Sequence, residues 1–502
     1  MIDQYRLGQA SLVLNSDLAG EFPVYIYLSE NNKTLLYSKS ITALLDDLRV
    51  EKPLKISREG LSFLLQNGVV PPPKTAYENI FILGLGDRCE ITTENNAVKV
   101  SFSHNFPFMN AQRLQPDAMQ PDEELILQML AEATISRLDT SRPSFLFHSA
   151  GKDSNSIALA LAEAGWQDRM TLISHKSKGS ADESEISAKI AKQLGFKHQV
   201  LREVDNLQAE HKQAIEEYFV NAPFPCTDNV TLAYPLYAHQ LPELKGANII
   251  DGGGNDSYMM TPPTAREKKA IPFSKIAHRA NFLRRIVNSE SLLSSSIRTS
   301  AERCGGMSGF SFVDTKKLLP DSKNVYTHWK QESHFRKKWD LFDFKTSILT
   351  PIVASELHIR KVRNFSDAIT SNLILPFTNS NVAKCFAEMP ESYLFDRTSL
   401  KNKLILRKIL KERIGLDSDA LGKLGFTYDS HAVVVRNWGA LSSEITNCEL
   451  WNKAGLESVT GRLTKKTDLG GRESLRAMDL LYRLYLISSW YNHNKFLAAG
   501  TN

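Results

Sequence analysis

The sequence predicts an α/β protein, in which a parallel sheet with a helical C-terminal part follows a small β-rich domain. Short apolar runs separated by polar turn residues fill the first hundred residues. Farther along, strand patterns alternate with helical patterns, which is typical of a parallel sheet covered by helices on both faces. From Glu332 onward the patterns are largely helical.

Two domains are expected, because 502 residues are long for a single hydrophobic core. The segment Asn105–Pro121 contains three prolines and little periodicity, so it is the best candidate for a linker. We therefore place the first domain at residues 1–112 and the second at residues 113–502.

The first domain begins with a predicted hairpin. Phe22–Leu28 and Thr34–Ser38 are apolar runs on either side of the polar turn residues Asn31–Lys33. Ser40–Leu48 has the pattern of a short helix. Further short strands are expected at Phe81–Leu85, Cys89–Thr93 and Val98–Phe102.

The second domain begins with a predicted helix, because Glu123–Leu138 carries apolar residues at helical spacing. Gly195 is expected to end the last helix of the following alternation in a left-handed cap. The alternation itself comprises strands at Ser144–His148 and Arg169–His175 and helices at Asn155–Ala164 and Glu183–Leu194.

Composition excludes several classes of function. The net charge of +5 is spread along the chain, so we expect no nucleic-acid surface. The five cysteines are scattered without Cys-x-x-Cys spacing, which argues against a zinc site or a disulfide framework and suits a reducing cytoplasm. Neither a signal peptide nor a run of 18 apolar residues is visible, so we expect a cytoplasmic protein without a membrane span.

The segment Ser149–Ser154 carries the chemistry of the second domain. It leads from a predicted strand through a tight turn into a helix, where backbone N–H groups can hold phosphate. The hydroxyls of Ser149 and Ser154 add donors, and Asp153 can hold Mg²⁺ that bridges phosphate oxygens. Lys152 points either at phosphate or at solvent. The alternative is an ordinary strand-to-helix turn in which Ser and Asp cap the helix.

This turn, Ser-Ala-Gly-Lys-Asp-Ser, resembles the Ser-Gly-Gly-x-Asp-Ser motif of the ATP pyrophosphatase (PP-loop) superfamily. Ala150 replaces one glycine of the motif, a change that still lets the backbone approach a ligand closely. The resemblance implies cleavage of ATP between its α- and β-phosphates, with adenylation of a substrate oxygen.

Later segments resemble asparagine synthetases and their relatives, the β-lactam synthetases and lasso-peptide cyclases. Ile249–Ser257 is similar to the family's Ser-Gly-Glu-Gly-Ser-Asp-Glu motif, in which Asp256 matches the Mg²⁺-binding aspartate. Lys423 matches a lysine that stabilises the charge developing around the adenylate. The resemblance covers roughly residues 113–500 and also rests on Thr171–Ser174, Asp182–Glu183, Leu375–Phe377, Lys403–Arg407 and Lys423–Phe426.

The resemblance implies a set of site residues, with ATP and Mg²⁺ as cofactors. Lys423, Asp256 and Asp153 would be catalytic, and Asp153 and Asp256 would hold the metal. The groups that bind ATP or pyrophosphate would be Phe147, Ser149, Ala150, Gly151, Lys152, Asp153, Ser154, Ser174, Gly252 and Gly253.

The first domain is similar to the family's class II glutaminase domain. The likeness lies in Pro23–Tyr27 and in Leu35–Ser40 with the apolar residues that follow. That domain works through an N-terminal cysteine, whereas here Met1 is followed by Ile2 and no cysteine precedes Cys89. We therefore expect a degenerate, truncated glutaminase-like domain that serves as a structural remnant or a docking surface.

The chain also departs from the family at the acceptor side. Gly253 stands where asparagine synthetases have glutamate, and Tyr258 nearby is expected to be a packing residue. Arg360–Asn364 is basic where β-lactam synthetases have a glutamate, and it would form either an anion site or a solvated helix face. Asn379 replaces an aspartate of the family. His148, beside the loop, is expected to be structural.

The expected function is an ATP-dependent ligase that adenylates a substrate carboxylate and transfers it to ammonia or an amine, in secondary-metabolite or surface-polysaccharide biosynthesis. The alternatives are a lasso-type peptide cyclase and a nucleotide-binding module without ligase activity. The expected partners are a small-molecule or peptide carboxylate, a separate amine donor or glutaminase, and a second copy of the chain in a homodimer.

Overall fold

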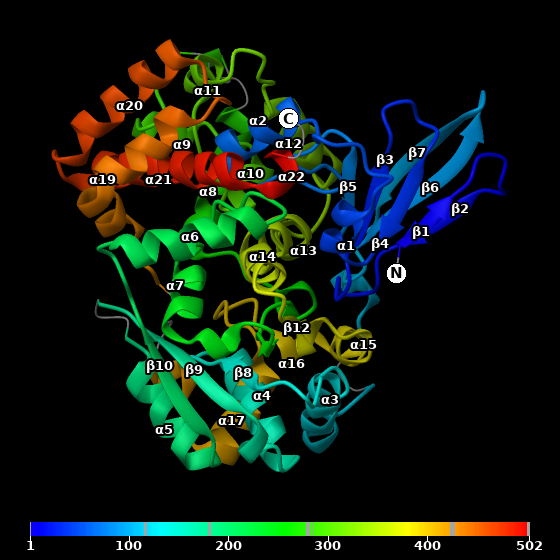
Figure 1. Ribbon diagram of the computed structural model, residues 1–502. Helices are drawn as coiled ribbons and strands as arrows, with labels where there is room; N and C mark the ends of the chain where they lie inside the picture. The colour runs from blue at the N-terminus through cyan, green and yellow to red at the C-terminus, as the bar shows by residue number, and fades with distance from the viewer. Residues whose placement is uncertain are drawn as a thin grey trace.

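The computed structural model describes residues 2–114, 118–178, 182–277, 282–284, 286–421 and 427–498. Figure 1 shows three regions: the N-terminal strands in blue, a parallel sheet in cyan and green, and a helical C-terminal part in orange and red. Helix α14 (Arg360–Ala368) lies between them near the middle of the view. The predicted α/β class, with a β-rich start and a helical end, is confirmed.

The N-terminal region is built from two antiparallel sheets. One has the order β1-β4-β3-β5 and the other the order β2-β6-β7. The predicted hairpin is confirmed, because β3 pairs with β4 in antiparallel register. The strands are β1 (Ile2–Tyr5), β2 (Leu12–Asn15), β3 (Val24–Leu28), β4 (Leu35–Ser38), β5 (Ile80–Leu83), β6 (Asp87–Glu94) and β7 (Ala97–His104).

Side-chain alternation along β3 gives this region two cores. Val24 and Ile26 face the second sheet and pack with Cys89 and Ile91 of β6. Tyr25 and the other inward-facing residues of β3 belong instead to the large core shared with the C-terminal helices. Two helices complete the region: α1 (Ile41–Asp46), which was predicted, and α2 (Arg58–Asn67), which was not.

The second region contains a five-stranded parallel sheet of order β10-β9-β8-β11-β12. The chain runs outward from β8 to β10 and then returns to the other side of β8, so the topology reverses between β8 and β11. The carboxyl edge at such a reversal is where open α/β sheets bind ligands. The strands are β8 (Ser144–Phe147), β9 (Thr171–Lys176), β10 (Lys197–Arg202), β11 (Asn248–Ile250) and β12 (Asn372–Ile374).

Helices cover both faces of this sheet, as predicted. Leu146 and Leu172 pack on α3, α4, α5 and α17, whereas the neighbouring Phe145 and Ile173 face the core that contains α6, α7 and α14. Gly195 ends α5 in a left-handed cap, as predicted. The covering helices are α3 (Glu123–Ile135), α4 (Lys152–Glu163), α5 (Ser184–Leu194), α6 (Ala209–Asn221), α7 (Ala233–Gln240) and α17 (Leu404–Ile414).

Most of the remaining helices form the upper part of Figure 1, whereas α15 (Ser380–Glu388) and α16 (Glu391–Leu394) lie lower and contact α3 and α17, respectively. The long helix α21 (Gly471–His493) is the centre of this part, and its Trp490 is completely buried. The helices before it are α8 (Ala265–Ala277), α9 (Leu292–Ser296), α10 (Ser300–Cys304), α11 (Phe312–Leu318), α12 (Tyr326–Phe335), α13 (Leu341–Ile348), a π-helix (Leu349–Ile359), α15 (Ser380–Glu388), α16 (Glu391–Leu394), α18 (Ser418–Leu421), α19 (Ser430–Asn447) and α20 (Lys453–Thr467); α22 (Lys495–Ala498) follows it.

The segment Asn105–Pro121, expected to be a linker, packs on the second region through several of its described residues. Phe106 and Phe108 are buried in the core that holds α3 and α4. The Arg113 guanidinium donates to the carbonyl oxygens of Tyr258 and Phe386, the latter at 3.3 Å. These contacts attach the segment firmly, and the domain boundary at residue 112 stays a prediction.

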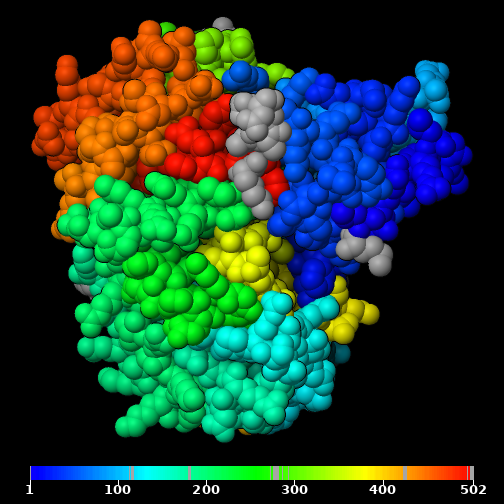
Figure 2. Space-filling view, viewed as in Figure 1, coloured from blue at the N-terminus to red at the C-terminus, as the bar shows by residue number. Residues whose placement is uncertain are grey.

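The basic segment Arg360–Asn364 attaches the N-terminal region to α14. The buried Arg360 pairs with Glu356 at 2.7 Å, and it donates to the Tyr25 hydroxyl of β3 at 3.2 Å. Arg363 donates to the carbonyl oxygen of Gly20 at 2.9 Å. The alternative of a solvated helix face is therefore wrong. In Figure 2 the blue N-terminal residues lie directly against the yellow residues at the centre of the molecule.

Within the residues that the structure describes, no helix is long and apolar enough to cross a membrane.

Replacing Arg360 by alanine is expected to lower the free energy of unfolding by about 3–5 kcal/mol, because Glu356 would lose its buried partner. Denaturant titration measures the loss, and hydrogen exchange should increase first in β3 and β4. Arg169→Ala, at an exposed arginine, is the matched control and should change stability by less than about 0.5 kcal/mol. Equal stability of the two variants would contradict the structural role of Arg360.

Candidate active site

The predicted phosphate-binding loop connects β8 to α4 at the carboxyl edge of the parallel sheet. Helix α4 begins at Lys152, earlier than the predicted start at Asn155, because Gly151 has extended backbone and forms the N-cap. Glycine offers no side chain to cap the helix, so the first N–H groups of α4 are left for an anion.

Hydrogen bonds within the loop determine its shape. The Ser149 hydroxyl accepts from the N–H of Gly151 at 3.0 Å, and the Ser154 hydroxyl accepts from the N–H of Ser149 at 3.2 Å. The Asn155 amide donates to the carbonyl oxygen of Ser149 at 2.9 Å. The loop therefore holds its curvature without a ligand.

Two residues predicted to contact ATP do not line the cavity beside the loop. Ala150 is buried, and its N–H donates to the Glu183 carboxylate at 2.9 Å, so this N–H is not directed at a phosphate. Lys152 does not line the cavity; burial lowers its pKa, and the nearby Arg407 and Lys403 lower it further. Glu183 is a positioning residue for the loop that sequence analysis did not assign.

Two carboxylates predicted to hold metal meet at a single cation. Lys403 Nζ lies 2.6 Å from Asp153 Oδ2 and 3.0 Å from Asp256 Oδ1. Asn255 donates to the other oxygen of Asp153 at 2.6 Å. Asp153 lies in the first turn of α4 and Asp256 follows β11, so the ammonium joins the two loops on either side of the topological reversal.

Lys403 is held tightly in this position. It is buried, and its backbone has a left-handed φ of 59° at the start of α17. Burial alone would lower the pKa of this ammonium, but the ion pairs with Asp153 and Asp256 outweigh burial and raise it. A positive φ in a residue other than glycine is uncommon and persists where the surroundings impose it.

A glycine allows the two loops to approach each other. A Cβ atom on Gly252 would lie 3.1 Å from the Asp153 Cβ and 3.2 Å from the Ser154 nitrogen, closer than ordinary contacts. A Cβ atom on Gly253 would lie 3.0 Å from Asp251 Oδ1 and 3.4 Å from the side chain of Ile359. The Gly253 position thus lies between a carboxylate and an apolar side chain.

The cavity between these loops measures about 280 Å³. Eight predicted site residues line it: Phe147, Ser149, Gly151, Asp153, Ser154, Ser174, Gly252 and Gly253. Aromatic and apolar groups, including Tyr234, Tyr237 and Val362, form much of the remaining wall. His358 and Lys361 add polar groups opposite the loop, and Lys361 pairs with Asp228 at 3.1 Å. An apolar wall with a few convergent polar groups is typical of a small-molecule site.

Two histidines, the buried His148 and the half-buried His198, support the loop and the neighbouring strand from behind. His148 Nδ1 lies 2.6 Å from the Ser187 hydroxyl, and its Nε2 lies 3.0 Å from the Asn155 side-chain oxygen. Burial lowers the pKa of His148 to about 3, so this histidine is neutral. His198 Nε2 in turn lies 2.9 Å from the Ser174 hydroxyl. His148 therefore has the structural role that was expected.

Two further acceptor-side residues have structural contacts. Tyr258 is fully buried, stacks on Phe386 and donates its hydroxyl to the carbonyl oxygen of Phe377 at 2.7 Å, as expected of a packing residue. The Asn379 side chain caps α15 by accepting from the N–H of Asn381 at 3.0 Å. Lys423, predicted to be catalytic, lies outside the described residues.

Sequence analysis missed the role of Lys403. It placed this lysine in a segment resembling a family helix without assigning it a function. The available signal was the position of Lys403 immediately before the apolar pattern of α17. That helix packs on α4, which carries Asp153. Among the described residues, no group of three or more His, Cys, Asp and Glu is placed to hold a metal.

These features define an α/β protein with a candidate ligand site at the carboxyl edge of a parallel sheet. The family model of asparagine synthase matches residues 125–427, more than half of the chain. The chain therefore belongs to the asparagine synthase family, whose members are ATP-dependent carbon–nitrogen ligases. A search of the curated proteins finds no match. Because the family match begins at residue 125, the glutaminase-like origin of the first domain stays a prediction.

Replacing Gly252 by valine is expected to weaken ATP binding at least about tenfold, because the added side chain would separate the two loops. A loss of only about 1.4 kcal/mol of binding free energy gives that factor. Titration calorimetry measures the affinity. Gly439→Val, in helix α19 where a Cβ would meet open space, is the matched control and should bind ATP as the wild type does. Unchanged affinity in both variants would contradict the close approach of the loops.

Proposed function

We propose that this protein is an amide-bond-forming ligase that adenylates a substrate carboxylate and transfers the acyl group to ammonia or an amine. One observation carries the proposal: Asp153 and Asp256 converge on a single cation beside the helix N-terminus of the Ser149–Ser154 loop. This arrangement combines donors for phosphate with two carboxylates for a cation.

The two carboxylates fit a magnesium ion. Mg²⁺ is commonly bound by one or two carboxylates together with substrate phosphates and water, which is the donor set available here. The Lys403 ammonium between them is direct evidence that this point favours positive charge. When bound, Mg²⁺ would neutralise charge on the phosphate oxygens.

The proposed reaction has two steps. In the proposed first step, the substrate carboxylate attacks the α-phosphorus of ATP and pyrophosphate leaves, while Lys403 and the N-terminus of α4 stabilise the departing charge. In the second step, the amine attacks the carbonyl carbon of the acyl-adenylate and AMP leaves. We assign charge stabilisation in the second step to Lys423, as the resemblance implies.

The amine must lose a proton when it attacks, and Gly253 supplies no base. His358 lines the cavity opposite the loop. The His358 side chain is about half exposed (54%) and its Nε2 lies 4.0 Å from Asp228. Partial withdrawal from water and the nearby Lys361 lower the pKa of His358, although Asp228 raises it, and the neutral imidazole that this favours can accept a proton. We therefore assign this role to His358 within the proposed mechanism.

Incubation with ATP and Mg²⁺, with and without a small-molecule extract of the host, is expected to yield AMP and pyrophosphate only when extract is present. Asp153→Ala should abolish these products, because it removes one of the carboxylates that gather the cation. Mass spectrometry of the nucleotides provides the measurement. ADP, or ATP binding without turnover when extract and a panel of peptides are both supplied, would contradict the ligase and favour the nucleotide-binding module.

A further inference from the structure

A second cavity lies far from the loop, where the N-terminal region meets the C-terminal helices. Its wall is formed by Gln66 and Asn67 of α2, the segment Met307–Ser311, and Arg476 of α21, together with the α9–α10 segment. It measures about 30 Å³ and shares no lining residue with the ATP cavity among the described residues. This volume holds about two water molecules, so it suits a small ion and excludes a nucleotide.

Three guanidinium groups and one carboxylate line this cavity. The carboxylate, Glu302, pairs with Arg284 at 2.7 Å and accepts from the N–H of Thr299 at 2.8 Å. The second guanidinium, Arg476, donates to the Ser294 hydroxyl at 3.1 Å and to the carbonyl oxygen of Gly309 at 3.3 Å. The guanidinium groups of Arg284 and Arg476 therefore both have partners that are neutral or negatively charged.

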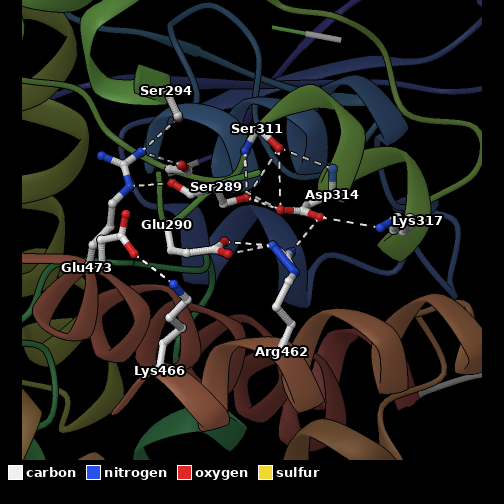
Figure 3. A network of polar contacts seen from close by, with 11 residues as sticks. Ser289, Glu290, Ser294, Ser311, Asp314, Lys317, Arg462, Lys466 and Glu473 are labelled. Atoms are coloured by element: carbon white, nitrogen blue, oxygen red, sulfur yellow. Dashed lines mark hydrogen bonds and ion pairs between the residues drawn. The ribbon is translucent and has the colours of Figure 1, made fainter. Parts of the chain in front are cut away.

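The other carboxylates of the neighbourhood are already paired. Figure 3 shows Arg462 of α20 between Glu290 and Asp314, each at 2.7 Å. Asp314 also accepts from the N–H of Ser289 at 3.0 Å. In the same view Glu473 pairs with Lys466 at 2.8 Å. The carboxylates of Glu290, Asp314 and Glu473 are therefore each already paired with a cation.

The third guanidinium, Arg298, is the exception. Among the described residues it has no hydrogen-bond or ion-pair partner, although it lines the cavity and is partly buried. Withdrawal from water and repulsion from Arg476 lower its pKa to about 10, and the attraction of the Glu302 carboxylate offsets these effects only in part. A guanidinium offers five N–H donors in a planar fork. An unpaired charge withdrawn from water is costly unless an anion compensates it.

We propose that this cavity binds a small oxyanion, a phosphate or carboxylate group, through the Arg298 guanidinium with Arg476 beside it. Arginine forks match both groups geometrically and hold them with charge-assisted hydrogen bonds. Because α2, α10 and α21 all contribute to the wall, the bound anion would join the N-terminal region to the C-terminal helices.

Thermal unfolding of the full-length protein tests the proposal, with a non-hydrolysable ATP analogue and Mg²⁺ present to fill the ATP cavity. Sodium phosphate is compared with sodium chloride at equal ionic strength. Saturating phosphate is expected to raise the Tm of the wild type by about 2 °C or more. A second series with sodium acetate distinguishes a phosphate ligand from a carboxylate ligand. A Tm shift with either anion supports the site and identifies which group it binds, and no shift with either anion overturns the proposal.

Arg298→Met should abolish the shift, and in chloride alone it should unfold at the same or a higher temperature than the wild type, because an unpaired charge has been removed. Arg303→Met, at the neighbouring arginine that donates to Ser274 at 3.0 Å and does not line the cavity, should keep the shift. If Arg298→Met fails to fold, Arg298→Lys tests the same point, with phosphate affinity expected to fall about tenfold through loss of the fork. A shift that survives at Arg298→Met or Arg298→Lys unchanged would overturn the proposal.

Discussion

The active site depends on one buried ammonium group, that of Lys403, and on the two carboxylates that it holds together. Asp153, Asp256 and Lys403 come from three segments separated by more than a hundred residues each, and they meet within 3.0 Å of one nitrogen atom. Without the lysine, the two carboxylates would repel each other in a partly buried site, and one of them would tend to take up a proton. The ion pairs thus determine the distance between the loops after β8 and β11, which determines the shape of the cavity proposed for ATP.

The rest of the fold maintains the conditions that this cluster needs. The parallel sheet brings the two loops to one edge, and Gly252 lets them come into contact. Glu183 and His148 hold the phosphate loop from behind, while α14 closes the opposite wall with Lys361 and Val362. Through Arg360 the same helix also holds the N-terminal region. That region therefore contributes to the position of a wall of the cavity, whatever its evolutionary origin.

Local pattern was sufficient to predict the fold class, the hairpin of β3 and β4, and the strand–loop–helix around Ser149, because these features depend on neighbours in sequence. Local pattern did not predict the contacts between residues that lie far apart in the sequence. The N–H of Ala150, which was predicted to contact ATP, meets Glu183. Arg360, in a segment expected to form an anion site or a solvated helix face, is buried against Tyr25. Lys403 was recognised only as part of a helix, because its local sequence does not show that its ammonium group contacts Asp153 and Asp256.

The central claim is that Lys403 gathers the two carboxylates and compensates their charge. The most direct test is the affinity for ATP in EDTA, measured by titration calorimetry for the wild type and for Lys403→Met. The matched control is Lys401→Met, at an exposed lysine that pairs with Asp419 at 2.8 Å. The account predicts at least about tenfold weaker binding by Lys403→Met, because two uncompensated carboxylates would face the triphosphate, and no loss for Lys401→Met. Equal affinities for the wild type and both variants would contradict it.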